Sequence, residues 1–202
     1  VLDLVIAVHA APQAARAMAL PDLYLIPLRD ELEAMLGRGP DGAREAGPEV
    51  SSRPAGPWTR PMTRLLSANE AAVAALFRRY DELVGLAEAA PSRAVLTHGE
   101  PHRANTMLTS DGWRLIDWDT ALVAPPERDL WHLDAGDGSQ LRRYEAATGV
   151  RARPGLLELY RVRWDVTDLA IEVSRFRRPH AGTPEDEQSW QLLCELVAQV
   201  SA

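Results

Sequence analysis

The order of apolar and polar residues along the chain predicts mostly helices. Residues 2–9 carry apolar side chains on most faces, as a buried helix does. Apolar residues recur at helical intervals from Val73 to Ala87, after a Ser67…Glu70 pair with capping-box spacing, and Pro91 ends this helix. Further helices are predicted over residues 28–36, 127–135, 139–148, 155–177 and 184–200.

A small β region is predicted in the middle of the chain. Residues 106–109 and 113–118 are rich in β-prone side chains, and the Asp111-Gly112 step between them is a strong hairpin signal. A short β-like run over 94–97 precedes them. Residues 37–61 are rich in Gly, Pro, Ser and Arg, which predicts a long loop or a disordered insertion. The fold class is therefore α+β, mainly α, and residues 1–202 are expected to form one lobe.

Composition and charge narrow the classes of function. The chain of 202 residues is 46% apolar and 25% charged, as in soluble globular proteins, and its net charge is −7. Nucleic-acid binding usually leaves a basic footprint, so the acidity favours a cationic small molecule instead. No apolar run reaches the ~20 residues of a membrane span. Cys194 has no second cysteine to pair with, which favours a reducing, cytoplasmic location, and it falls on an apolar helix face.

Three side chains around the predicted hairpin suggest a chemistry. Glu100 and Asn105 lie on the loop between residues 94–97 and the hairpin, and Asp117 lies at the end of the return strand, so the three can converge at one sheet edge. Phosphoryl transfer needs a carboxylate to orient and deprotonate the acceptor hydroxyl, and hard oxygen ligands for Mg²⁺. The spacing therefore predicts a Mg-nucleotide site.

The same residues carry a family resemblance. The run His98-Gly99-Glu100-Pro101-His102-Arg103-Ala104-Asn105 resembles the HGDxHxxN catalytic loop of the aminoglycoside phosphotransferase family. Ile116-Asp117-Trp118 resembles the family's metal-binding segment, and residues 127–130 and 161–170 resemble later elements. The resemblance covers nearly the whole chain and is nearest the spectinomycin-phosphotransferase-like branch.

The resemblance implies a fold, an activity and a role for each motif residue. The chain would be the C-terminal lobe of a protein-kinase-like enzyme that moves the γ-phosphoryl group of ATP to a hydroxyl of an aminoglycoside-like antibiotic or a similar small molecule. Glu100 would be the catalytic base. Asn105 and Asp117 would hold Mg²⁺ and the nucleotide. His102 would face the phosphates, and His98 would brace the loop.

Two departures from the family pattern matter. Glu100 stands where the family has Asp, and a positioning error near ~1 Å can cost roughly 100-fold in rate, so either the backbone compensates or activity is weak. All 22 basic residues are Arg, and no Gly-rich phosphate loop precedes the motif. We therefore expect the N-terminal nucleotide lobe to be missing and this chain on its own to lack catalysis. The alternatives are a non-catalytic lobe that binds a ligand or partner, and a metal hydrolase.

Further acidic residues are candidates for contacts to the acceptor. Asp119 could touch metal or substrate, or could fix the loop before Pro125. Asp134 and Asp137 follow the helix after the metal motif. Asp168 shares a helix face with Asp165 and Glu172, which is either an acidic wall for a cationic acceptor or a solvated face.

Two other motif residues have structural explanations. Asp129 is predicted to brace a helix or to hydrogen-bond the catalytic loop. Sharing of a metal by His98 and His102 would suit a helix, which Gly99 and Pro101 disfavour.

Overall fold

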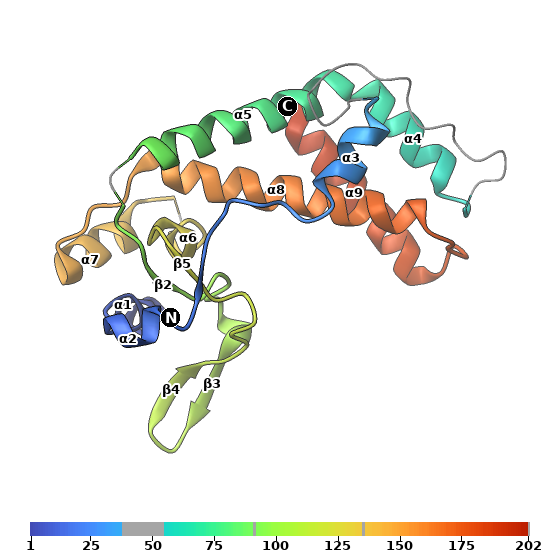
Figure 1. The fold of residues 1–202 in the computed structure, drawn as a ribbon. Helices are drawn as coiled ribbons and strands as arrows, with labels where there is room; N and C mark the ends of the chain where they lie inside the picture. The colour runs from blue at the N-terminus through green and yellow to red at the C-terminus, as the bar shows by residue number, and fades with distance from the viewer. Residues whose placement is uncertain (38–54, 91, 135, 202) are drawn as a thin grey trace. The chain divides into compact units, whose positions relative to one another are not determined.

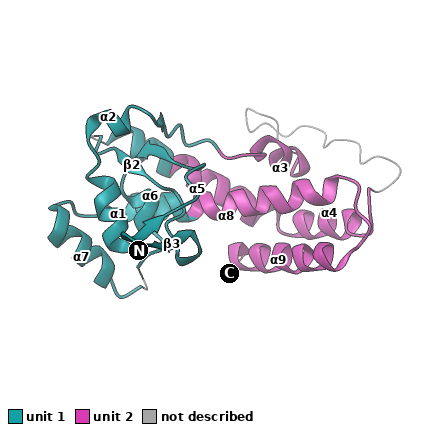
Figure 2. Cartoon of the chain, turned by 90° about the horizontal axis from the view of Figure 1, so that it is seen from below, with its two compact units in different colours: residues 1–25, 83–161 teal, residues 26–82, 162–202 magenta. Residues whose placement is uncertain are grey.

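The computed structural model describes residues 1–37, 55–90, 92–134 and 136–201, and most of these are helical (Figure 1). They group into two compact units (Figure 2). The first comprises residues 1–25 and 83–161, and the second residues 26–82 and 162–202. Two long helices, α5 (Glu70–Ala89) and α8 (Pro154–Arg177), contribute residues to both units. The expectation of a single lobe stays a prediction.

The first unit contains two small sheets. In one, β5 lies between β1 and β2, parallel to β1 and antiparallel to β2, so that Thr97 pairs with Leu122. The other is the β3–β4 hairpin, in which Thr106 pairs with Leu115. The elements are α1 (Leu2–His9), α2 (Gln13–Arg16), β1 (Leu20–Pro21), β2 (Val95–Thr97), the 3₁₀ turn η1 (Arg103–Asn105), β3 (Thr106–Thr109), β4 (Gly112–Leu115), β5 (Leu122–Ala124), α6 (Glu127–Leu130) and α7 (Ser139–Thr148).

The core of the first unit joins three helices that are far apart in the sequence. Leu2 and Val5 of α1 pack with Leu130 of α6 and Tyr144 of α7, and all four are at least 94% buried. This apolar cluster holds α1 in place, and α1 also contacts β2.

The second unit is helical. Besides parts of α5 and α8 it contains α3 (Arg29–Met35), α4 (Thr59–Ala68) and α9 (Pro184–Ser201). Trp58 stacks on Trp190 of α9 with ring centroids 5.1 Å apart. The fully buried large side chains of the second unit include Leu32, Met62, Leu66, Phe77, Tyr80, Phe176 and Leu193.

Most of the predicted helices are confirmed, and several boundaries differ. The helices predicted over 2–9, 28–36, 139–148, 155–177 and 184–200 agree with the structure to within one residue. Helix α4 begins at Thr59, inside the predicted loop 37–61, because the first turn of a helix tolerates Pro61, whose missing N–H would have no partner there. Residues 38–54 of that loop lie outside the described residues.

The predicted capping box is also wrong. Ser67 lies within α4, and the next helix, α5, begins after Asn69. The Asn69 carbonyl accepts the N–H groups of Ala72 and Val73, and its side-chain amide donates to the Leu65 carbonyl at 2.8 Å. Asn69 therefore ends one helix and starts the next.

Three smaller differences concern the first unit. Helix α6 ends at Leu130, short of the predicted residue 135, which lies outside the described residues. Strand β4 ends at Leu115, so residues 116–118 are not part of it. Strands β1 and β5 were not predicted.

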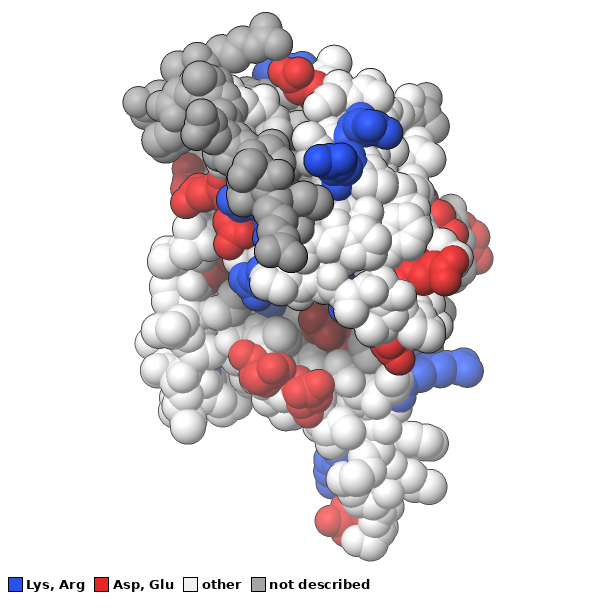
Figure 3. Space-filling view, turned by 90° about the vertical axis from the view of Figure 1, so that its right-hand side faces the viewer, with Lys and Arg blue, Asp and Glu red and all other residues white. Residues whose placement is uncertain are grey.

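Two observations bear on partners. None of the helices in the described ranges is both long and apolar enough to cross a membrane. On the face in Figure 3, the coloured basic and acidic side chains are interspersed among uncharged ones.

Cys194 is half-buried on α9, and burial raises the pKa of its thiol, so it stays protonated near neutral pH.

Two neighbouring leucines of α9 test the packing of the second unit. Leu193 is fully buried and Leu192 is 41% exposed. Leu193→Ala should lower the free energy of unfolding by about 2–5 kcal/mol, because it leaves a cavity in the core. Leu192→Ala should cost less than about 1 kcal/mol. Urea titration of both variants measures the difference, and equal losses would contradict the packing described for α9.

Candidate active site

The main chain that follows β2 is held by a buried carboxylate. Asp129 of α6 is fully buried, and its two side-chain oxygens accept the N–H groups of His98 at 2.8 Å and Gly99 at 2.6 Å. A buried charge is costly unless it is hydrogen-bonded, and bonds from N–H groups to a carboxylate are among the stronger ones. Asp129 therefore fixes the first two residues of the 98–105 loop.

The His98 side chain connects this loop to the segment after β4. Its ring is buried, and Nε2 lies 2.8 Å from the Ile116 carbonyl oxygen. Nδ1 accepts the N–H of Glu100 at 3.3 Å, an arrangement that assigns the ring proton to Nε2. Trp118 packs on the ring with centroids 4.7 Å apart. Both ring nitrogens are thus engaged within the protein.

A buried arginine closes the other side of the loop. Arg128 donates to the Thr97 hydroxyl at 2.9 Å and to the Thr120 carbonyl at 2.7 Å. The Thr120 hydroxyl donates to the His98 carbonyl at 2.8 Å. Between them Gly99 has φ +101°, and a Cβ there would lie within 2.7 Å of the Arg128 guanidinium and the Thr120 hydroxyl. The site therefore requires glycine for both its backbone angle and its space.

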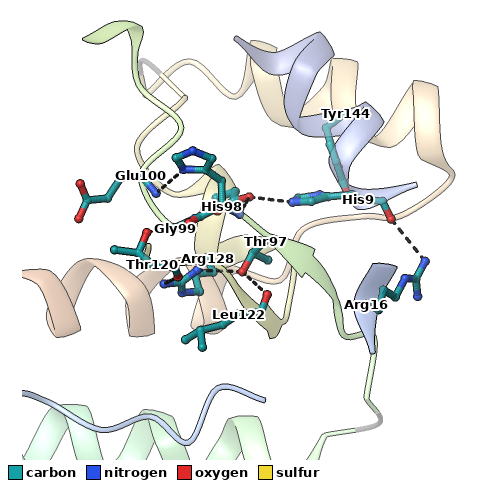
Figure 4. Close-up of polar contacts among 11 residues, drawn as sticks. His9, Arg16, Thr97, His98, Gly99, Glu100, Thr120, Leu122, Arg128 and Tyr144 are labelled. Atoms are coloured by element: carbon teal, nitrogen blue, oxygen red, sulfur yellow. Dashed lines mark hydrogen bonds and ion pairs between the residues drawn. The ribbon is translucent and has the colours of Figure 1, made fainter. Parts of the chain in front are cut away.

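The second half of the loop orients Asn105. Its side-chain amide nitrogen donates to the Glu100 main-chain carbonyl at 3.0 Å. Its main-chain carbonyl accepts the Ile116 N–H at 3.0 Å. The first bond holds the amide by its nitrogen and leaves Oδ1 for a ligand. The second bond places Asn105 beside the residue that precedes Asp117. Glu100 is half-buried, and in Figure 4 its carboxylate points away from the bonded cluster.

Asp117 has an unusual backbone and an unengaged side chain. Its φ is +66°, in the left-handed region, which Asp and Asn adopt more readily than most residues. Asp117 and Asp119 are exposed, and neither carboxylate makes a hydrogen bond or an ion pair with the described part of the chain. Together with Oδ1 of Asn105 they offer the hard oxygen atoms that Mg²⁺ prefers.

The residues present fit a cation that is shared with a ligand. Within the described ranges, no group of three or more His, Cys, Asp or Glu could hold a metal ion by itself. Mg²⁺ is commonly bound through one or two carboxylates plus substrate phosphates, so Asn105 and Asp117 suffice as protein ligands when phosphates supply the rest. The metal-hydrolase alternative, which needs tight binding without nucleotide, gains no support here.

The two remaining histidines near the loop differ in exposure. His102 is exposed, and its Nε2 lies 3.4 Å from the Asn105 amide nitrogen. His132 was missed by sequence reasoning. Both of its ring nitrogens are buried without a partner among the described residues, and burial lowers its pKa against the opposing effect of Asp129. His132 is therefore neutral at physiological pH.

The other acidic candidates belong to later parts of the chain. Asp134 accepts the N–H groups of Gly136, Gly138 and Gln140, so its carboxylate holds the loop before α7. Asp137 accepts the Ser139 N–H at 2.8 Å, and its hydrogen bonding to Ser139 lowers its pKa. Asp168 lies on α8 in the second unit. Roles in acceptor binding remain predictions for all three.

Sequence reasoning missed the support behind Asp129. His9 of α1 is buried, with Nε2 3.1 Å from Asp129 and Nδ1 2.8 Å from the Tyr144 hydroxyl. Burial raises the pKa of Tyr144 to about 12, so its hydroxyl stays protonated and can donate to His9. His9 and Asp129 are 120 residues apart, and nothing local in the sequence marks them as partners.

Comparisons with known proteins agree with the motif. A model of the phosphotransferase enzyme family, APH, matches residues 3–163. Protein StrN of Streptomyces griseus is 30% identical over 206 residues, which cover 98% of this chain and 59% of StrN. The fold is similar to that of the spectinomycin phosphotransferase APH(9)-Ia in two solved structures. The complex with ADP and spectinomycin has a TM-score of 0.69, at 18% identity, over 100% of this chain and 63% of that one. The complex with AMP has a TM-score of 0.62, also at 18% identity, over 99% and 64%.

The chain thus spans about three fifths of the length of these relatives. The family match covers most of the chain and includes the 98–105 loop, Asp117 and Asp129. The predicted family is confirmed: the chain belongs to the aminoglycoside phosphotransferase family of phosphotransferase enzymes.

Proposed function

We propose that the protein transfers the γ-phosphoryl group of ATP to a hydroxyl group of a small molecule. Glu100 acts as the general base, and Asn105 and Asp117 hold Mg²⁺. The observation that carries this proposal is that two hydrogen bonds join the 98–105 loop to Ile116. Nε2 of His98 lies 2.8 Å from the Ile116 carbonyl oxygen, and the Ile116 N–H donates to the main-chain carbonyl of Asn105 at 3.0 Å. These bonds support a common location for the base and the two magnesium ligands.

The reaction needs few steps from the protein. The acceptor oxygen forms a bond to the γ-phosphorus while the bond from that phosphorus to the β–γ bridging oxygen breaks, and ADP leaves with the electron pair. Glu100 orients the acceptor hydroxyl and takes its proton. Mg²⁺, when bound, neutralises phosphate charge. Asn105 and Asp117 position the phosphates, and the bonds around His98 keep the loop rigid during the transfer.

The donor and acceptor classes are drawn from a structural relative. A spectinomycin phosphotransferase with this fold has been crystallised with ADP and spectinomycin and with AMP. We propose ATP as donor and an aminoglycoside-like or aminocyclitol hydroxyl as acceptor. Exposed Asp119 and the net charge of −7 favour a cationic acceptor. Use of ATP would place the enzyme in the cytoplasm, and modification of an antibiotic would make it a resistance enzyme.

The first test is calorimetric titration of the purified chain with ATP, with and without Mg²⁺. We expect binding that depends on Mg²⁺, since Asn105 and Asp117 belong to this chain. The chain covers 59% of StrN, so binding is a better first readout than turnover. Absence of any magnesium-dependent binding would instead favour a lobe that binds a ligand or partner without transferring phosphate.

Asp117→Asn separates chemistry from folding at the proposed metal site. Asn also tolerates the left-handed backbone, so the variant should fold normally, but it lacks the negative charge that binds Mg²⁺. We expect magnesium-dependent ATP binding to fall at least tenfold, about 1.4 kcal/mol. Asp111→Asn in the exposed hairpin turn is the matched control. Unchanged binding, or normal turnover in a phosphate-transfer assay, would show that Asp117 is not a magnesium ligand.

Glu100 is tested by a pair of substitutions. Glu100→Gln keeps the size but removes the proton acceptor, so turnover in the active protein that carries this chain should fall by roughly 10²–10⁴. Glu100→Asp keeps a carboxylate at shorter reach and should lose less. Phosphate transfer from labelled ATP to a panel of aminocyclitols measures both variants. A Gln variant as active as the parent would show that Glu100 is not the base.

Two glycines with nearly the same backbone angle test the rigidity of the loop. Gly99 and Gly112 have φ +101° and +103°, but a Cβ meets Arg128 at Gly99 and open space at Gly112. Both alanine variants bear backbone strain of about 1–3 kcal/mol. Gly99→Ala should in addition displace Arg128 or the loop and weaken magnesium-dependent ATP binding at least tenfold. Calorimetry measures ATP binding by the two variants, and thermal unfolding measures their stability. Equal effects of Gly99→Ala and Gly112→Ala on binding would contradict the role of Gly99 in the loop.

A further inference from the structure

The first unit contains a cavity of about 770 Å³ between α7 and the chain that leads into α8. This volume falls in the usual range of about 300–1,000 Å³ for small-molecule sites. Its charged lining consists of four arginines and one glutamate: Arg93, Arg142, Arg151, Arg153 and Glu145. None of the proposed base and metal ligands lines this cavity.

The excess of cations at this cavity is unexpected in a chain with a net charge of −7. Two of the arginines are partly engaged by the protein. Arg93 is paired with the buried carboxylate of Glu127 and donates to the Arg151 carbonyl at 2.7 Å. Arg142 donates to the Asp137 carbonyl at 3.1 Å.

The other two guanidinium groups have unused donors. The side chains of Arg151 and Arg153 make no hydrogen bond or ion pair with the described residues. Arg93 adds a buried Nε that has no partner among those residues. Two unneutralised cations and an unsatisfied donor at one cavity favour an anionic ligand, because a guanidinium fork matches carboxylate and phosphate oxygens.

The rest of the lining is apolar. Leu141 of α7, Val150, and Leu157 of α8 line the cavity. They also pack against the core cluster of the first unit, so this wall is part of the folded interior. Contact with such a wall would stabilise a ligand by removing its apolar surface from water.

We propose that this cavity binds an organic anion, a carboxylate or phosphate group on an apolar body. The anionic group pairs with Arg151 and Arg153, and the apolar body lies against Leu141, Val150 and Leu157. Glu145 is the one acidic residue of the lining and opposes the binding of an anion. This site is separate from the proposed phosphoryl-transfer site and does not depend on that function.

The test uses four probes on the purified chain. Phenyl phosphate and 3-phenylpropionate carry both features, inorganic phosphate carries only the charge, and 2-phenylethanol carries only the apolar body. Calorimetry should show that one or both of the first two probes bind at least roughly tenfold more tightly than the last two. Comparing phenyl phosphate with 3-phenylpropionate distinguishes a phosphate ester from a carboxylate as the natural anion.

Variants locate the site. R151Q and R153Q should each weaken binding of the tighter probe, and the double variant should weaken it at least roughly tenfold, since hydrogen bonds to charged groups are among the stronger ones. E145Q should strengthen it. R114Q in the hairpin is the control for loss of one positive charge, and D117A separates this cavity from the nucleotide site. Neither should change the affinity.

Three results would overturn the proposal. Inorganic phosphate could bind as tightly as phenyl phosphate, the double variant could retain full affinity while folded, or D117A could abolish binding of the probe. Thermal unfolding of each variant shows whether it is folded. If the double variant unfolds, the two single variants decide.

Discussion

The buried carboxylate of Asp129 is the interaction on which the candidate site depends. It accepts two consecutive N–H groups from the loop, those of His98 and Gly99, and a ring nitrogen of His9 lies 3.1 Å from it. A fully buried charge is tolerable only when such donors surround it, so the loop and the helices constrain one another. Because Gly99 is held at φ +101°, the direction in which Glu100 leaves the loop follows from these bonds.

The sequence predicted the parts of this arrangement that are local. Helical periodicity located α7, α8 and α9, and the Asp111-Gly112 step located the hairpin, because each signal lies within a few adjacent turns or strands. The order of Glu100, Asn105 and Asp117 around that hairpin predicted that they would converge, and the bonds through Ile116 are consistent with this.

The rest depends on contacts that sequence patterns do not encode. Strands β1 and β5 are extended because they pair with each other, and β5 also pairs with β2. His9 belongs to the site through the packing of α1 on α7, which brings it to Tyr144 over a separation of 135 residues. A capping-box spacing at Ser67 was overridden because α4 continues past it to Ala68. For the strands and for His9, tertiary contacts decided between local options.

The choice of Glu100 over Asp can be argued from the same bonds. The Glu100 N–H donates to His98, and its carbonyl accepts from Asn105 and from the His102 N–H, so its main chain is fixed on both sides. A main chain fixed by these bonds cannot shift back to compensate for a longer side chain. The additional methylene therefore carries the carboxylate outward by about 1.5 Å, one carbon–carbon bond. Under the proposed function, in which Glu100 is the base, the acceptor lies farther from the loop than it would with Asp, so the compensation belongs to the acceptor pocket and not to the backbone.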